Sequence, residues 1–361
     1  MNPALPETMA AVLLTGHGGF DKLEYCMDVA VPAPGADQVL IRVLAAGVNN
    51  TDINTRIGWY SKGVESATDV GGGAGFSSAN ASDASWSGAP LPFPRIQGAD
   101  VCGRIVAVGA GVDPARIGER VLVAPIQRAP DGSFEGWMGS ECDGGFAQYT
   151  LAYSAGAYRV TDALSDTELA SFPCAYSTAE NLLHRAGVTA RDTVLITGAS
   201  GGVGSAAVQL AKRRGAAVLA VAGVTKMAGV KVLGADQVIA RGENLINILG
   251  RDAVNIVIDL VAGPQWPQLL DILRPGGRYA TSGAIAGPLV TLDVRTLYLK
   301  DLTLLGCTRQ EPVVFENLTG YISRGEIQPV VAGTYPLQDI VKAQQDFLAK
   351  TFTGKLVLIP P

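Results

Sequence analysis

A glycine-rich stretch near the middle of the chain is the clearest candidate for chemistry. The segment VLITGASGGVGSAAVQLAK, residues 194–212, places a turn between an apolar run and an amphipathic run. It fits a dinucleotide fingerprint as Ala199-x-Gly201-x-x-Gly204, with alanine where the first glycine usually stands. Gly201 would let the backbone approach a pyrophosphate, Gly204 would let helix and strand pack closely, and the helix N-terminus would attract the phosphates. We therefore expect the cofactor to contact Ala199, Ser200, Gly201, Gly202, Val203 and Gly204; a plain strand-to-helix turn is the alternative.

The residues after this turn indicate which dinucleotide binds. Sites specific for NAD carry an acidic residue about 20 positions after the fingerprint, where it accepts hydrogen bonds from the ribose 2′-hydroxyl. This chain has no acidic residue between Gly204 and Asp236, and the next strand-like run leads into Thr225 and Lys226. A hydroxyl and an ammonium suit a 2′-phosphate, so the sequence favours NADPH over NADH. A solvated role for Lys226 is the competing interpretation, but it does not explain the missing acid.

The elements around this turn predict an α/β fold with a second, mainly β unit. From Asp192 onward, strand-like runs alternate with helical segments such as residues 202–214, which is typical of a doubly wound parallel sheet, the Rossmann fold. Before about residue 160, short β-branched runs alternate with Gly, Pro and Asp, as in a barrel-like unit. The final run GKLVLIP predicts a strand that returns to this unit. We expect a discontinuous substrate domain (1–160 and 325–361) around a Rossmann domain (161–324).

One segment, residues 61–94, shows neither the helical nor the strand spacing of apolar residues. Residues 61–94 are rich in Gly, Ser, Ala and Pro. Loops of this length inside compact domains are usually functional or disordered, so a lid and a flexible tether are both open. Trp86 and Phe93 favour at least one anchored contact.

Composition excludes several classes of function. The 361 residues are 48% hydrophobic and 17% charged with a net charge of −5, and no basic run suggests binding to nucleic acid or to a membrane surface. No apolar stretch reaches the roughly 18 residues that a membrane span needs. Five scattered cysteines without a Cys-x-x-Cys pair, and only two histidines, argue for reduced thiols in a cytoplasmic protein and against a zinc site.

At this point the chain resembles the medium-chain dehydrogenase/reductase superfamily, and within it the quinone-oxidoreductase-like branch. The resemblance covers nearly the whole chain outside 61–94 and implies a GroES-like substrate domain beside the Rossmann domain. Each motif is modestly specific alone, whereas their order and spacing are highly specific. The motifs are AAGVNNTDINTR (45–56), GADVCGRIVAVGAGV (98–112), IGERVLV (117–123), DGGFAQY (143–149), the GASGGVG turn, LGADQVI (233–239), LRPGGRYATSG (273–283) and GKLVLIP.

The resemblance also implies a site without metal. Zinc-dependent members carry a cysteine where this chain has Asn49 and a His-Glu pair where it has Ala99 and Asp100; only Cys174 matches a ligand position. One thiolate with at best a weak carboxylate is too few ligands for a tetrahedral zinc ion.

The implied catalytic residues come from the first motif and the residues after it. Asn49 and Asp52 would border the nicotinamide, with Asn49 and Thr51 as hydrogen-bond donors to a developing oxyanion and Asp52 orienting its neighbours. Tyr60 is a candidate proton donor, with solvent as the alternative. Purely structural roles are the alternatives: Asn49 and Asp52 could only form a turn, and Tyr60 could be an aromatic side chain packed between the domains.

The expected function is transfer of a hydride from NADPH to a quinone or an α,β-unsaturated carbonyl compound. A metal-free alcohol dehydrogenase or ketone reductase, and a non-catalytic NADPH-binding module, are the alternatives. The apolar run LTLLG predicts an edge strand that pairs in a homodimer. The expected cofactor site also includes Arg241 near the 2′-phosphate, and Thr178, Ser282, Gly283 and Thr308.

Overall fold

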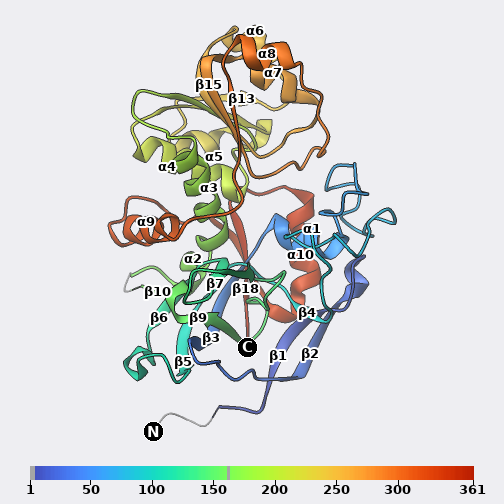
Figure 1. Cartoon of the computed structure of the whole chain (residues 1–361), viewed down its shortest axis with the longest axis vertical. Helices are drawn as coiled ribbons and strands as arrows, with labels where there is room; N and C mark the ends of the chain where they lie inside the picture. The colour runs from blue at the N-terminus through green and yellow to red at the C-terminus, as the bar shows by residue number, and fades with distance from the viewer. Residues whose placement is uncertain (1–4, 161–162) are drawn as a thin grey trace.

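A computed structural model describes residues 5–160 and 163–361. The first four residues of the predicted substrate domain and the first two of the predicted Rossmann domain lie outside the described residues. The predicted fold class is confirmed: a Rossmann sheet with helices on both faces lies above a mainly β, GroES-like domain in Figure 1. Within the described ranges, none of the helices is long and apolar enough to span a bilayer.

The Rossmann sheet has the strand order β13-β12-β11-β14-β15-β16, and all its pairs are parallel. Each predicted strand run forms one of these strands. The order reverses between β11 and β14, which is where open α/β sheets bind ligands. The strands are β11 (Thr193–Ile196), β12 (Ala217–Ala222), β13 (Gln237–Ala240), β14 (Val254–Asp259), β15 (Leu273–Thr281) and β16 (Thr303–Gly306).

Alternation along β11 explains the two helical layers. Val194 and Ile196 belong to a core with the helices α3, α4 and α9, whereas Leu195 belongs to a separate core with α7 on the opposite face. Because a strand buried on both faces must be apolar at every position, the continuous run VLI is the expected sequence. The helices are α3 (Pro173–Arg185), α4 (Gly202–Arg213), α5 (Met227–Val232), α6 (Leu245–Leu249), α7 (Trp266–Asp271), α8 (Val294–Leu299) and α9 (Pro312–Ser323).

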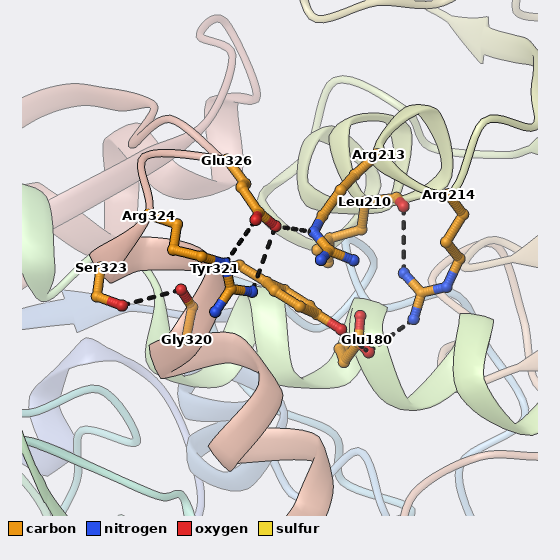
Figure 2. Close-up of polar contacts among 9 residues, drawn as sticks. All are labelled: Glu180, Leu210, Arg213, Arg214, Gly320, Tyr321, Ser323, Arg324 and Glu326. Atoms are coloured by element: carbon orange, nitrogen blue, oxygen red, sulfur yellow. Dashed lines mark hydrogen bonds and ion pairs between the residues drawn. The ribbon is translucent and has the colours of Figure 1, made fainter.

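A buried carboxylate joins three of these helices (Figure 2). Glu180 of α3 is 1% exposed, and its Oε1 accepts hydrogen bonds from Arg214 Nη2 at 2.6 Å and from the Tyr321 hydroxyl at 3.2 Å. The Arg213 guanidinium lies 3.5 Å from the centre of the Tyr321 ring and pairs with Glu326. These contacts fix α9 against α3 and the C-terminal end of α4.

The mainly β domain is built around β3 (Gln38–Val48). This long strand pairs antiparallel with β5 (Cys102–Val108), β9 (Tyr149–Tyr153) and the last strand, β18 (Lys355–Ile359). The pairing of β18 with β3 shows that the end of the chain returns to the first domain, as the run GKLVLIP predicted. The other elements are β1 (Thr8–Leu14), β2 (Leu23–Ala30), β4 (Arg95–Ile96), β6 (Arg120–Val123), β7 (Ile126–Arg128), β8 (Phe134–Trp137), β10 (Ala157–Arg159), β17 (Val331–Pro336), α1 (Asn50–Ile57), α2 (Asp166–Leu169) and α10 (Ile340–Ala349).

The segment 61–94 forms neither helix nor strand, yet it is anchored to both domains. It lies beside α1 and α10 at the right of Figure 1. Gly72 O accepts a hydrogen bond from Arg56 Nη2 at 2.7 Å, and Thr68 N donates to Ile285 O of the Rossmann domain at 3.1 Å. Phe93 packs edge-on against His17, with ring centres 4.9 Å apart, and Trp86 stacks on the β7–β8 hairpin. Both aromatic side chains therefore make the anchored contacts expected of them.

Candidate active site

A cleft between the two domains gathers most of the expected site residues. It lies at the carboxyl ends of the Rossmann strands and is closed on the other side by the β3–α1 junction, the insertion and the loop before β18. The lining includes Val48, Asn49, Asn50, Thr51, Asn54, Trp59, Tyr60, Trp86, Trp137, Cys174, Thr178, Gly201, Gly202, Val203, Gly204, Ser282, Gly283, Thr308, Lys350 and Lys355. The structure therefore brings the phosphate-binding turn and the polar first motif to one cleft.

The glycine-rich turn has the geometry that a dinucleotide needs. The helix α4 begins at Gly202, and Gly201 before it has extended backbone angles. A Cβ at Gly204 would lie 2.2 Å from Gly198 O, so only glycine allows this close contact of helix and strand. The first N–H groups of α4 have no partner inside the helix and open onto the cleft, where they suit phosphate oxygens.

Three cations gather where the second and third strands end. Lys226 follows β12 in the turn Val224–Lys226, and Arg241 follows β13. Lys226 Nζ donates to Lys350 O at 2.6 Å, so the loop after α10 brings the Lys350 cation to the same corner. Burial and the neighbouring Arg241 lower the pKa of Lys226, and burial together with Lys226 lowers the pKa of Lys350 to about 8. Mutual repulsion of this kind is relieved when an anion binds between the cations.

The opposite end of the cleft offers hydrogen-bonding groups for the nicotinamide. Thr178 on α3, Ser282 and Gly283 after β15, and Thr308 after β16 all line it. The Ser282 hydroxyl is buried and has no hydrogen-bond partner among the described residues. Buried polar groups are rarely left unpaired, so an unpartnered hydroxyl here fits a ligand in the cleft.

A buried ion pair forms the polar centre beside this end. Lys355 Nζ, at the start of β18, lies 2.6 Å from Asp100 Oδ2, and the two side chains are 3% and 0% exposed. The other oxygen, Asp100 Oδ1, accepts a hydrogen bond from Cys174 N at 2.5 Å. Gly47 of β3 makes room for this carboxylate, since a Cβ there would lie 2.3 Å from Asp100 Oδ2. The ion pair therefore depends on four separate segments of the chain.

Asn49 takes part in this centre in a way that the sequence did not predict. Its Nδ2 donates to Asp100 Oδ2 at 2.8 Å and to Gly47 O at 3.3 Å, while its Oδ1 accepts from Lys355 Nζ. In this structure Asp100 Oδ2 and Gly47 O accept the two amide N–H bonds of Asn49, so donation to a substrate oxygen stays a prediction that requires one of these bonds to open. Asn49 fixes the position of the Lys355 ammonium at the cleft.

Asp52 lies behind Asn49 and does not line the cleft. Its Oδ2 accepts a hydrogen bond from Asn49 N at 2.7 Å, and its side chain is 1% exposed. Burial raises the pKa of Asp52 to about 7, against the opposing effects of the Asn49 amide and of Lys355. This contact is half of a capping box at the start of α1 and is compatible with the orienting role, which stays a prediction.

Two hydroxyl groups face the cleft together. Thr51 Oγ1 and the Tyr60 hydroxyl are 2.9 Å apart, on α1 and just after it. Burial raises the pKa of Tyr60 above its usual value, so the phenol keeps its proton at neutral pH. The pair can donate a hydrogen bond to a substrate oxygen without a change of charge in the protein.

The residues at this centre do not fit a zinc ion. Lys355 places a positive charge among Asn49, Asp100 and Cys174, where a second cation would be repelled. Burial raises the pKa of the Cys174 thiol well above its usual value, so the thiolate that zinc requires is disfavoured. No group of three or more His, Cys, Asp or Glu side chains within 5–160 and 163–361 is placed to hold a metal.

Sequence reasoning missed two of the residues that shape the cleft. Lys355 belongs to the quoted run GKLVLIP. The only sign in the sequence that it has a function is that it is the one charged residue in this apolar run. Lys350 carried no signal, because its place depends on a left-handed turn with φ of 52° that ends α10. Among the expected cofactor residues, Ala199, Ser200, Thr225, Lys226 and Arg241 lie outside the cleft lining.

Comparison with known proteins shows the family of the chain. Residues 35–162 match the family model "Alcohol dehydrogenase GroES-like domain", and residues 202–324 match "Zinc-binding dehydrogenase". The chain is 31% identical to the quinone oxidoreductase of Lama guanicoe, covering 97% of both chains. It is 30% identical to the acryloyl-coenzyme A reductase of Metallosphaera sedula, covering 97% of this chain and 99% of that one.

A solved structure extends the comparison. A putative alcohol dehydrogenase from Sinorhizobium meliloti 1021 superposes with a TM-score of 0.87 at 47% identity, covering 99% of this chain and 98% of that one. The relatives are oxidoreductases, and so is this chain. It belongs to the medium-chain dehydrogenase/reductase superfamily, in the quinone-oxidoreductase-like branch.

Proposed function

We propose that this oxidoreductase uses NADPH to reduce α,β-unsaturated carbonyl compounds or quinones without a metal ion. The observation that carries the proposal is the position of the Lys355 ammonium, held by Asp100 and Asn49 in the same cleft that the Thr51–Tyr60 hydroxyl pair lines. These groups supply a positive charge and hydrogen-bond donors where other members of the superfamily use zinc. The names of the quinone oxidoreductase and acryloyl-coenzyme A reductase relatives support this substrate class.

The residues of the chain have separable roles in this reaction. NADPH, when bound in the cleft, would supply the hydride that reduces the acceptor. Thr51 and Tyr60 donate hydrogen bonds to the acceptor oxygen, where negative charge develops, and the Lys355 cation stabilises that charge in a site of low polarity. The proton that completes the reduction comes from Tyr60 or from solvent. Asn49 and Asp52 hold the Lys355 ammonium and the start of α1 in place.

The preference for the phosphorylated cofactor rests on the corner formed by Thr225, Lys226 and Arg241. A phosphate dianion would form charge-assisted hydrogen bonds there, and none of these three residues carries a carboxylate that would repel it. We expect kcat/KM to be higher with NADPH than with NADH, and Lys226→Met to lower the value for NADPH alone. Lys231→Met, on the adjoining helix α5, is the matched control. Equal use of NADH by the unaltered protein would contradict the preference.

A ketone reductase is the second candidate, and the structural relative named as a putative alcohol dehydrogenase favours it. The product separates the two functions. NADPH oxidation with a panel of enones and quinones should yield saturated ketones and quinols, whereas an alcohol formed from an enone would support the second candidate. Protein purified without chelators should contain less than one zinc ion per chain, and a full equivalent would contradict the metal-free mechanism.

A further inference from the structure

We propose that an arginine-lined hollow beside the cleft binds the phosphate groups of the acceptor, so that the substrate is an unsaturated acyl thioester of a phosphorylated carrier. The hollow has a volume of about 790 Å³, and Thr308 lines both it and the cleft. The reducible end and the phosphate end of one molecule would therefore occupy adjoining spaces. The inference rests on the proposed function for the reducible end only.

The charge of the hollow is unusual for this acidic protein. Arg128, Arg185 and Arg309 line it together with His184, and the one carboxylate in its lining is that of Glu311. None of the three arginines forms an ion pair within the part of the chain that the structure describes. Arginine guanidinium groups match phosphate oxygens in charge and geometry, so three unpaired ones around one hollow suit a phosphorylated ligand.

The arginines are also held in place by contacts that leave N–H groups free. Arg128 Nη2 donates to Gln310 O at 2.7 Å, and Arg185 Nη1 donates to Gly306 O. The Arg309 guanidinium lies 5.1 Å from the centre of the Phe134 ring. Because a guanidinium has five N–H groups, each arginine keeps donors for a ligand after these contacts.

A row of aromatic rings connects the hollow to the cleft. Trp86 and Trp137 line the cleft, and their rings are stacked with centres 4.9 Å apart. Trp86 also stacks on Phe134 at 5.8 Å, and Phe134 is the ring that Arg309 covers. The uncharged linker of an acyl thioester can pack along this row while its phosphates reach the arginines. This arrangement gives the insertion a role, because Trp86 is its contribution to the row.

The test compares acceptors that differ only in the phosphate-bearing tail. Crotonyl-coenzyme A and crotonyl-N-acetylcysteamine share the reducible end, and but-3-en-2-one is a neutral acceptor without a thioester. We expect KM to be at least about tenfold lower for crotonyl-coenzyme A than for the truncated thioester, and to rise with ionic strength for crotonyl-coenzyme A alone. Equal KM values for the two thioesters would overturn the proposal.

Variants locate the effect. In the double variant Arg185→Ser/Arg309→Ser, KM for crotonyl-coenzyme A should rise about tenfold or more, while kcat/KM for but-3-en-2-one stays within about twofold. The control is Arg104→Ser, which also removes an exposed arginine bonded to a backbone carbonyl. An equal loss with both acceptors, or a change of oligomeric state by light scattering, would instead assign the arginines to folding or to a contact between copies.

A binding measurement separates this inference from the proposed function. Calorimetry with free coenzyme A requires no turnover, so it decides the matter even if no acceptor is reduced. Binding that is lost in the double variant supports the phosphate site, and the absence of binding in the unaltered protein contradicts it. Inorganic phosphate is titrated in parallel; if it binds as tightly as coenzyme A, the hollow is a site for free phosphate and not for a substrate tail.

Discussion

Lys355 Nζ and Asp100 Oδ2 lie 2.6 Å apart in the interior, and both charged groups make further hydrogen bonds. Asp100 Oδ1 accepts from Cys174 N, and Asn49 bonds to both charged side chains. A buried ion pair offsets its desolvation only when its geometry is good and its other hydrogen bonds are made, and this pair satisfies both conditions. Because Lys355 lines the cleft, we infer that the ion pair serves the reaction and not only the stability of the fold.

Removing the cation alone should destabilise the protein. Lys355→Met leaves the Asp100 carboxylate buried without a partner, which typically costs about 3–5 kcal/mol in the free energy of unfolding. Lys355→Met/Asp100→Asn removes both charges and should recover most of that loss, as measured by urea denaturation. The folded double variant should nevertheless show a kcat at least about tenfold lower, because the oxyanion loses its nearby charge. Lys342→Met, at an exposed pair, is the control, with an expected cost of at most about 1 kcal/mol.

Asn49 should affect the rate more than cofactor binding. Asn49→Ala removes the hydrogen bonds that hold Lys355 Nζ and Asp100 in position. The glycine-rich turn and the three cations near the ends of β12 and β13 are unchanged. We expect a lower kcat and an NADPH Kd within about twofold of the original. Asn49→Asp would place a second carboxylate beside Lys355 and serves as a charge-altering comparison. An unchanged kcat in Asn49→Ala would remove this residue from the mechanism.

The sequence predicted the elements that local pattern controls and missed the contacts that span the chain. The apolar run before Gly198 and the helical period after it identified β11 and α4, because hydrophobic spacing and turn chemistry act over a few residues. Lys355 and Asp100 are 255 positions apart in the sequence, and no local pattern around either residue predicts that the two form a pair. The hydrogen bonds of Asn49 to Asp100 and Lys355 were not predicted for the same reason, since both partners come from elsewhere in the chain.

Asp52 gives the folded state a pH dependence of known sign. Burial raises the pKa of this carboxyl from about 3.8 to about 7, so the folded protein binds a proton more tightly than the unfolded chain. The stability contributed by the protonated group is fully present below about pH 4 and is lost as pH rises through 7. Relative to Asp52→Asn, the original protein should therefore lose a few kcal/mol of unfolding free energy between pH 4 and pH 8, since each pKa unit corresponds to about 1.4 kcal/mol.

Denaturant titrations of both proteins at several pH values measure this difference. Taking the difference cancels other titrating groups that the two proteins share. A constant difference between the original protein and Asp52→Asn from pH 4 to pH 8 would contradict the raised pKa.

Lys350 should make cofactor binding weaken at alkaline pH. Burial and the neighbouring Lys226 lower the pKa of Lys350 to about 8, so its charge is lost between pH 7 and pH 9.5. Because the neutral amine no longer attracts the cofactor phosphates, the NADPH Kd should rise several-fold over this range. Lys350→Met should bind more weakly at pH 7 and show a flatter profile, whereas Lys342→Met should follow the original curve. Fluorescence titration of NADPH at fixed ionic strength measures these values.

The free edge of the Rossmann sheet predicts a homodimer. β16 pairs with β15 on one side, and in the described part of the chain no strand covers its other side. Exposed apolar side chains occur on β16 and on α8, the helix that precedes it in the chain: Leu304 is 37% exposed, Val294 60% and Leu299 71%. Unpaired apolar edges associate readily, and a two-fold axis beside β16 would join two sheets into one while burying these side chains.

Light scattering at micromolar concentration should therefore give the mass of two chains. Leu299→Glu/Leu304→Lys introduces charge into the expected interface and should shift the protein toward a monomer. Val232→Glu is the matched control, because this side chain on α5 is 87% exposed and lies away from β16. A monomeric original protein would exclude the dimer, and a dimer that survives the double variant would place the interface on another surface.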